Sequence, residues 1–317
     1  MKIAAFHFVW VAFLSFPGMA AAAVNSSAGT SASACHYPSA KDMATSRASR
    51  QRGGASQSGS PWMPLDAVLL PTPKQRRDFM LRTIREQLES RHSTFKLDEL
   101  DRVLAVMRGI DREAFVPPTQ SRYAYLRMSL EIGFCQTLSD AYIIALTVAA
   151  AHIGPDDNVL DIGTGSGYQA AILSSLAGHV QSLEIIPQLA DRARKRLRHL
   201  GYHNIEVATA DGFEGWARLA PFDAIIVSAG GTSIPAPLIQ QLRPGGRLLM
   251  PIGDTLLEEE LVLVTKSKTG AVTQCTLGLA AFVPMTGQAQ LTTQKPAKDG
   301  SARHSSARPF CYGVPVT

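Results

Sequence analysis

The sequence has 317 residues but few cysteines, and no two of them lie close together. The four cysteines form no C-x-x-C motif: Cys35, Cys135, Cys275 and Cys311. This spacing excludes a zinc ribbon and indicates no disulfide framework. Three histidines near predicted element ends have no carboxylate or cysteine partner at metal-ligand spacing: His179, His199 and His203. No metal site is therefore predicted.

Other familiar signals are also missing. The chain has no internal repeat, no Gly-Lys-Ser/Thr ending of a Walker loop and no Ser-His-Asp pattern of a hydrolase. Its formal charge is only +5, spread over the terminal regions and one predicted helix. The basic run 192–196 on that helix is interpreted as a solvated face, so no nucleic-acid partner is predicted.

The two ends differ in composition from the middle. Residues 3–24 are almost wholly apolar after Lys2 and end in small residues, which is typical of a secretory signal peptide. Their length also approaches that of a membrane anchor, and a later start at Met63 or Met80 is the alternative. Residues 25–76 are rich in Ser, Ala, Gly, Arg and Pro, which predicts a disordered linker. Residues 288–317 are predicted to form a loose tail.

Residues 77–287 carry the pattern of one folded domain. Two helices are predicted first, at 77–90 and 98–107, as a cap over the core, followed by a polar loop at 129–140 and an apolar helix at 141–151. Strands and helices then alternate: 159–162, 169–177, 180–185, 187–200, 205–209, 224–227, 236–242 and 247–251. A hairpin of two further strands, 260–265 and 271–279, follows. The alternation predicts an α/β fold with a doubly wound, mostly parallel, Rossmann-like sheet and an antiparallel addition at one edge.

A glycine-rich loop follows the first strand of this pattern. Its acid-x-G-x-G-x-G order places Asp161 before three glycines: Gly163, Gly165 and Gly167. A dinucleotide motif, G-x-G-x-x-G, would need glycine at position 168, which is Tyr168. Glycine permits close backbone approach to a ligand, and an acid before the loop suits a cationic amino group rather than a pyrophosphate.

Two further acids stand at the ends of the next predicted strands. Glu184 lies at the spacing where a carboxylate meets ribose hydroxyls in doubly wound folds. Asp211, followed by Gly212, is placed to accept a hydrogen bond from an adenine amino group. Together with the loop they predict S-adenosylmethionine as the cofactor. The predicted cofactor-binding residues are Asp161, Gly163, Thr164, Gly165, Gly167, Glu184, Asp211 and Gly212.

Several motifs resemble the protein-L-isoaspartate O-methyltransferase family over residues 77–287. They are Asp111–Pro117 (DREAFVP), Gly133–Ser139 (GFCQTLS), Pro221–Val227 (PFDAIIV), Leu242–Leu248 (LRPGGRL) and Phe282–Met285 (FVPM). The resemblance implies methylation of isoaspartyl carboxylates in damaged proteins as the first step of repair. It also implies that Ser139 is the active-site residue and that Gln136, Thr137 and Ser139 bind the substrate. On the residues alone, Ser139 or Asp140 is interpreted as the N-cap of the helix that follows.

Departures from the family pattern lie on the acceptor side: Asp140, Ala141 and Ala281. A carboxyl methyltransferase with another acceptor, or an exported binding protein that kept the fold, therefore stays an alternative. The expected partners are proteins or peptides with isoaspartyl residues, and a monomer is expected. Since S-adenosylmethionine is made in the cytosol, a cytoplasmic location is predicted. The alternative is a periplasmic protein, or one tethered to the membrane through residues 1–24.

Overall fold

The computed structural model describes residues 72–91, 97–253, 259–289, 308 and 311. The predicted signal-like segment 1–24 lies outside these residues, as does the predicted linker up to residue 71. The first described helix, α3 (Pro73–Arg91), begins four residues before the predicted domain start at Arg77. Within the described residues, no helix combines the length and the apolar character needed to cross a membrane.

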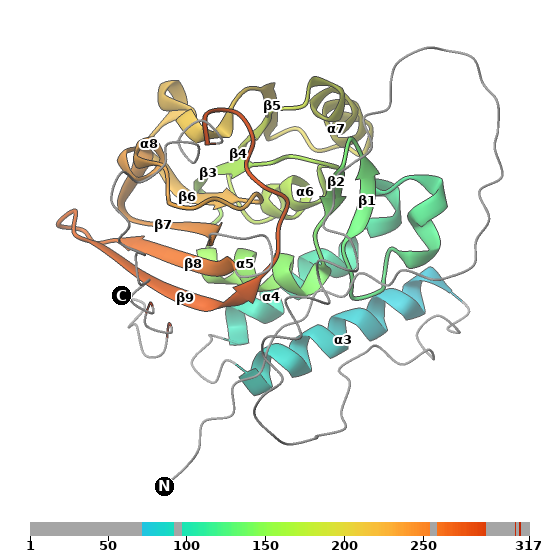
Figure 1. Ribbon diagram of the computed structural model, residues 1–317. Helices are drawn as coiled ribbons and strands as arrows, with labels where there is room; N and C mark the ends of the chain where they lie inside the picture. Colours follow the sequence, from blue (N-terminus) through green and yellow to red (C-terminus); the bar gives the residue numbers. More distant parts are fainter. Residues whose placement is uncertain (1–71, 92–96, 254–258, 290–307, 309–310, 312–317) are drawn as a thin grey trace, which may run out of the picture. The chain divides into compact units, whose positions relative to one another are not determined.

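A seven-stranded sheet forms the centre, with strand order β5-β4-β3-β6-β7-β8-β9 (Figure 1). Its strands are β3 (Asn158–Ile162), β4 (His179–Glu184), β5 (Ile205–Thr209), β6 (Phe222–Val227), β7 (Leu242–Ile252), β8 (Glu259–Lys266) and β9 (Val272–Ala280). Strands β3 to β7 pair in parallel, whereas β8 and β9 pair antiparallel at one edge. The predicted doubly wound sheet with an antiparallel addition is therefore confirmed.

Helices cover both faces of the sheet because alternate strand residues point in opposite directions. Val159 belongs to a core with the N-terminal helices, whereas its neighbour Leu160 belongs to a second core on the other face. The helices are α3, α4 (Leu97–Gly109), α5 (Ala141–Ala151), α6 (Tyr168–Ser174), α7 (Pro187–His199) and α8 (Ala236–Gln241). Short 3-10 helices complete the domain: η1 (Arg112–Phe115), η2 (Pro118–Tyr123), η3 (Gly212–Glu214) and η4 (Ala217–Leu219).

Helix α5 explains where the N-terminal helices lie. All eleven of its residues are buried, as expected for a helix that is apolar on every side. One side packs on β6 and β7, and the other side packs on α3 and α4. The N-terminal helices thus form an outer layer over α5.

Two local predictions differ from the structure. The segment expected to be a polar loop contains an antiparallel hairpin, β1 (Leu130–Gly133) and β2 (Gln136–Leu138). Its turn places Phe134 and Cys135 at positive φ, which side chains other than glycine seldom adopt. The segment 243–246, which separates the predicted helix 236–242 from the predicted strand 247–251, lies inside β7, where an irregularity in the pairing with β6 accommodates the extra residues.

The expectation of no disulfide framework is wrong. Cys275 on β9 forms a disulfide with Cys311, 36 positions later in the chain, and Cys135 is also disulfide-bonded. The spacing rule fails because long-range pairs are set by the fold and leave no local signature. The predicted loose tail is fixed to the sheet edge where it is described, since Arg308 also pairs with Glu260 at 2.8 Å.

Candidate active site

A cavity opens at the carboxyl ends of the parallel strands, next to β3, which pairs with β4 on one side and with β6 on the other. In open α/β sheets this switch point is the usual ligand site. Most of the predicted site residues line the cavity together: Gln136, Thr137, Ser139, Gly163, Thr164, Gly165, Glu184, Asp211 and Gly212. Asp161 and Gly167 are not among the lining residues and lie behind them.

The glycine loop requires glycine for its backbone conformation. Gly163, Gly165 and Gly167 all have positive φ, at 92°, 53° and 90°. At Gly165 an added Cβ would also lie 3.2 Å from the Ile132 side chain of β1. The loop therefore runs close to the hairpin with its backbone open to the cavity, which is the geometry needed to hold a ligand by main-chain groups.

Asp161 has a different position from the one expected of a ligand-binding acid. It is fully buried, and its carboxylate accepts hydrogen bonds from Ser182 Oγ at 2.7 Å and Gln169 Nε2 at 2.8 Å. Burial raises the pKa of this carboxyl to about 6, against the effect of both donors. Asp161 thus holds Gln169, which itself lines the cavity and also bonds Ser228. Asp161 therefore supports the residues that line the cavity and does not line it.

Glu184 and Asp211 both face the cavity while holding nearby backbone. Glu184 accepts from the Gly165 N–H at 2.8 Å and from the Ile186 N–H at 3.0 Å. Asp211 accepts from the N–H groups of Phe213 at 2.9 Å and Gln288 at 2.8 Å. Each carboxylate oxygen can accept more than one hydrogen bond, so both acids retain capacity for a ligand.

Ser139 lies between the last residue of β2 and Asp140, which precedes α5, so hairpin and helix together fix its position. The N-cap of α5 is Asp140, whose Oδ1 accepts from the Tyr142 N–H at 2.9 Å. Of the two residues proposed as cap, the structure therefore selects Asp140. This leaves the Ser139 hydroxyl on the cavity wall for another partner.

The segment 282–286 closes another side of the cavity. Gly230 anchors it at both ends, donating to the Val283 carbonyl at 2.9 Å and accepting from the Met285 N–H at 2.7 Å. Glu259 supports it from behind, accepting from the Phe282 N–H at 2.7 Å. The FVPM motif signals this segment in the sequence. Glu259 has no such signal, because it stands within a run of three identical acids, the glutamates at 258–260.

The buried Glu259 carboxyl predicts a pH-dependent stability. Burial raises its pKa to about 7, from an ordinary value of 4.5, although the Phe282 N–H acts in the opposite direction. Between these values the folded state binds the proton more tightly than the unfolded chain. The free energy of unfolding should therefore be highest below the ordinary pKa. It should decrease by up to about 3 kcal/mol as the pH rises to about 7.

Glu259→Gln stays neutral and keeps an acceptor for Phe282, so it should remove most of this decrease. Urea unfolding at about pH 5 and about pH 8 measures the difference, with Glu260→Gln as a control on the same strand. An unchanged pH dependence in Glu259→Gln would contradict the assignment.

The described residues contain no group of three or more His, Cys, Asp and Glu side chains that could hold a metal ion. The sheet order, the glycine loop after β3 and the acid at the end of β4 define the Rossmann-like class of S-adenosylmethionine-dependent methyltransferases. A family model described as Protein-L-isoaspartate(D-aspartate) O-methyltransferase (PCMT) matches residues 85–290. The chain belongs to this family.

Similar proteins agree with this placement. Protein-L-isoaspartate O-methyltransferase 2 of Polaromonas sp. is 46% identical over 200 residues, which cover 63% of this chain and 95% of the relative. The Gloeobacter violaceus protein-L-isoaspartate O-methyltransferase is 45% identical over 188 residues, which cover 59% of this chain and 91% of the relative.

Two solved structures share the fold. A protein-L-isoaspartate O-methyltransferase matches with TM-score 0.58 and 23% identity over 67% of each chain. A second protein, described as a protein-L-isoaspartate O-methyltransferase from Plasmodium falciparum in complex with S-adenosyl-L-homocysteine, matches with TM-score 0.53 and 21% identity. That match covers 64% of this chain and 97% of the other.

Proposed function

We propose that this enzyme transfers a methyl group from S-adenosylmethionine to the free carboxylate of isoaspartyl residues in proteins or peptides. The observation that carries the proposal is the convergence of two kinds of segment on one cavity. The glycine loop, Glu184 and Asp211 form one side, and the hairpin residues with Ser139 form the other. Donor and acceptor can thus be bound facing each other.

The hydrogen-bond acceptors of the cavity fit this cofactor chemically. We assign Glu184 to the ribose hydroxyls, since a carboxylate can accept from both of them, and Asp211 to the adenine amino group. Gly212 packs tightly against Ile162, another residue of the cavity lining, since a Cβ at Gly212 would lie 2.2 Å from Ile162 Cγ2. Bound in this way, the cofactor supplies a methyl group activated by a positively charged sulfur.

The acceptor needs little chemical activation. The free carboxyl of an isoaspartyl residue is its α-carboxyl, which has a pKa of about 3.5 and is ionised at neutral pH, so the enzyme does not need a strong base. The Ser139 hydroxyl would donate a hydrogen bond to one carboxylate oxygen and leave the other in line with the methyl group. Segment 282–286 would help to exclude water, so that alignment and desolvation provide the rate. The resulting ester can then close to a succinimide without further catalysis, as the neighbouring backbone nitrogen attacks the ester carbonyl and methanol leaves.

The product identifies the reaction. Incubation with an isoaspartyl peptide and S-adenosylmethionine should give the peptide methyl ester and then its succinimide in mass spectra. The altered acceptor side favours one rival, a carboxyl methyltransferase for a different acceptor, because Asp140 is tied to Arg127 at 2.9 Å. Methylation of small carboxylic acids without methylation of the peptide would support this rival. An exported protein that binds without catalysis would yield no product with either acceptor.

We infer an oxidising compartment from the Cys275–Cys311 disulfide. Disulfides persist in secreted and periplasmic proteins and are rare in the cytosol. The disulfide therefore supports the periplasmic alternative to the cytoplasmic location predicted from the cofactor. We continue to expect a monomer, which light scattering after size exclusion would test.

Loss of this disulfide should lower stability measurably. A cross-link spanning 36 positions is expected to contribute about 4 kcal/mol in the chain-entropy model. Cys311→Ser should therefore unfold at a clearly lower urea concentration than the oxidised wild type. Addition of a reductant should destabilise the wild type by more than it destabilises the variant, because the variant has no Cys275–Cys311 bond to lose. Equal midpoints for variant and oxidised wild type would contradict the role of this bond.

A further inference from the structure

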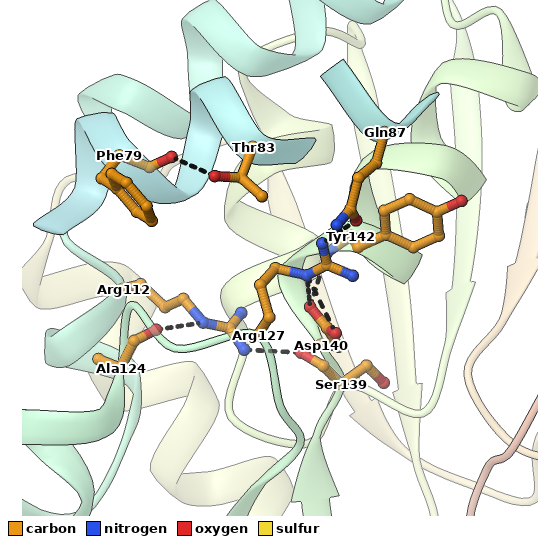
Figure 2. Close-up of polar contacts among 9 residues, drawn as sticks. All are labelled: Phe79, Thr83, Gln87, Arg112, Ala124, Arg127, Ser139, Asp140 and Tyr142. Atoms are coloured by element: carbon orange, nitrogen blue, oxygen red, sulfur yellow. Dashed lines mark hydrogen bonds and ion pairs between the residues drawn. The ribbon is translucent and has the colours of Figure 1, made fainter. Parts of the chain in front are cut away.

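Arg112 of η1 is completely buried directly behind Ser139. Its Nη2 donates to the main-chain carbonyl of Ser139 at 2.6 Å, and its Nε donates to the carbonyl of Ala124 at 2.8 Å (Figure 2). Ala124 precedes the β1–β2 hairpin and Ser139 follows it. One guanidinium therefore ties together the two chain segments from which the hairpin extends.

Within the described part of the chain, no carboxylate is bonded to the charged guanidinium of Arg112. Its guanidinium lies 4.8 Å from the ring centre of Tyr168, a residue that lines the cavity, and its Nη1 is buried without a hydrogen-bond partner among the described residues. Burial lowers the pKa of Arg112 from its ordinary value, with Tyr168 and Asp140 acting in the opposite direction. Burying such a charge is costly, and a methionine of similar volume would avoid the cost.

The neighbouring acid is already paired with another arginine. Arg127 Nε donates to both carboxylate oxygens of Asp140, at 2.9 and 3.2 Å, and its guanidinium lies over the Tyr142 ring (Figure 2). The two arginines therefore hold consecutive residues by different groups. Arg127 holds the side chain of Asp140, whereas Arg112 holds the backbone of Ser139.

We propose that Arg112 is a positioning residue for methyl transfer, which holds Ser139 at the cavity wall and supplies positive charge behind an anionic acceptor. The inference rests on the proposed function and extends it to a residue that does not line the cavity. Arginine suits the task because its rigid fork reaches two carbonyls at once, whereas lysine offers a single ammonium point. A carboxylate entering near Ser139 would gain Coulomb attraction in a region of low dielectric constant.

The test compares Arg112→Lys and Arg112→Met with a matched pair, Arg247→Lys and Arg247→Met. Arg247 is a half-buried arginine that donates to the Ala150 carbonyl at 3.0 Å, at the opposite end of α5 from Ser139. Burial lowers its pKa as well. Titration with S-adenosylhomocysteine counts the folded sites of each variant, and rates with an isoaspartyl peptide are expressed per folded site.

We expect Arg112→Lys to lower kcat/KM for the peptide by about tenfold and Arg112→Met by about a hundredfold, since small misplacements of a reacting group have effects of this size. Affinity for S-adenosylhomocysteine should stay within about twofold, and both Arg247 variants should keep most of the wild-type kcat/KM. Lysine keeps the positive charge but lacks the guanidinium fork, whereas methionine lacks both. The additional loss of kcat/KM in Arg112→Met would therefore measure the effect of the charge.

Three results would overturn the inference. They are wild-type kcat/KM in both Arg112 variants, losses no larger than those of the Arg247 variants, and no folded sites in Arg112→Lys when Arg247→Lys folds. The last result would make Arg112 a purely structural residue. An inactive wild type, by contrast, would refute the proposed function itself and the inference with it.

Discussion

Glu184→Ala is expected to weaken binding of S-adenosylmethionine by about two orders of magnitude. The carboxylate is assigned to two ribose hydroxyls, and hydrogen bonds to a charged group contribute about 1.5–3 kcal/mol each. The same side chain also accepts from the Gly165 N–H, so its loss releases the glycine loop. Glu184→Gln keeps the shape and one acceptor oxygen, and its loss of affinity should be smaller.

Calorimetric titration with S-adenosylmethionine measures this effect directly. Glu206→Ala is the matched control, because Glu206 is an exposed acid on the adjacent strand β5. Its affinity should equal that of the wild type. Binding by Glu184→Ala at wild-type affinity would show that the cofactor does not lie against the end of β4.

Ser139→Ala is expected to reduce kcat/KM for an isoaspartyl peptide by about a hundredfold, because alignment of the carboxylate depends on the lost hydrogen bond. Since Asp140 caps α5, the substitution removes no helix cap and should cost little stability. Affinity for S-adenosylmethionine should change by less than about twofold. The variant thus separates acceptor positioning from cofactor binding.

Steady-state rates with varied peptide concentration check this expectation. Ser90→Ala at the end of α3 serves as the control, because Ser90 is exposed and bonds only its own helix at Gln87 among the described residues. Wild-type turnover in Ser139→Ala would remove Ser139 from the site. A parallel loss of cofactor affinity would instead indicate a role in shaping the cavity.

The fold could be predicted from the sequence because its signals are local. Short apolar runs such as Val159–Ile162 and the periodic helix that begins at Pro187 indicate strands and helices regardless of their neighbours. Parallel strands then bring their carboxyl ends to one edge, which is why Glu184 and Asp211 could be placed beside the glycine loop.

Features that depend on the surroundings of a residue could not be predicted. Asp161 was expected to meet the ligand, but a sequence cannot show that Ser182 and Gln169 occupy its carboxylate. The Cys275–Cys311 bond joins residues that only the folded sheet edge brings together. Arg112 was visible only as part of a family motif, and its burial behind Ser139 depends on the whole hairpin.

The most direct test of the proposed function is methyl transfer to two peptides that differ only in one aspartyl linkage. With labelled S-adenosylmethionine, the isoaspartyl peptide should accept the methyl group, and its normal aspartyl twin should accept almost none. Equal labelling of both peptides, or none of either under conditions where the enzyme binds the cofactor, would contradict the proposed isoaspartyl specificity.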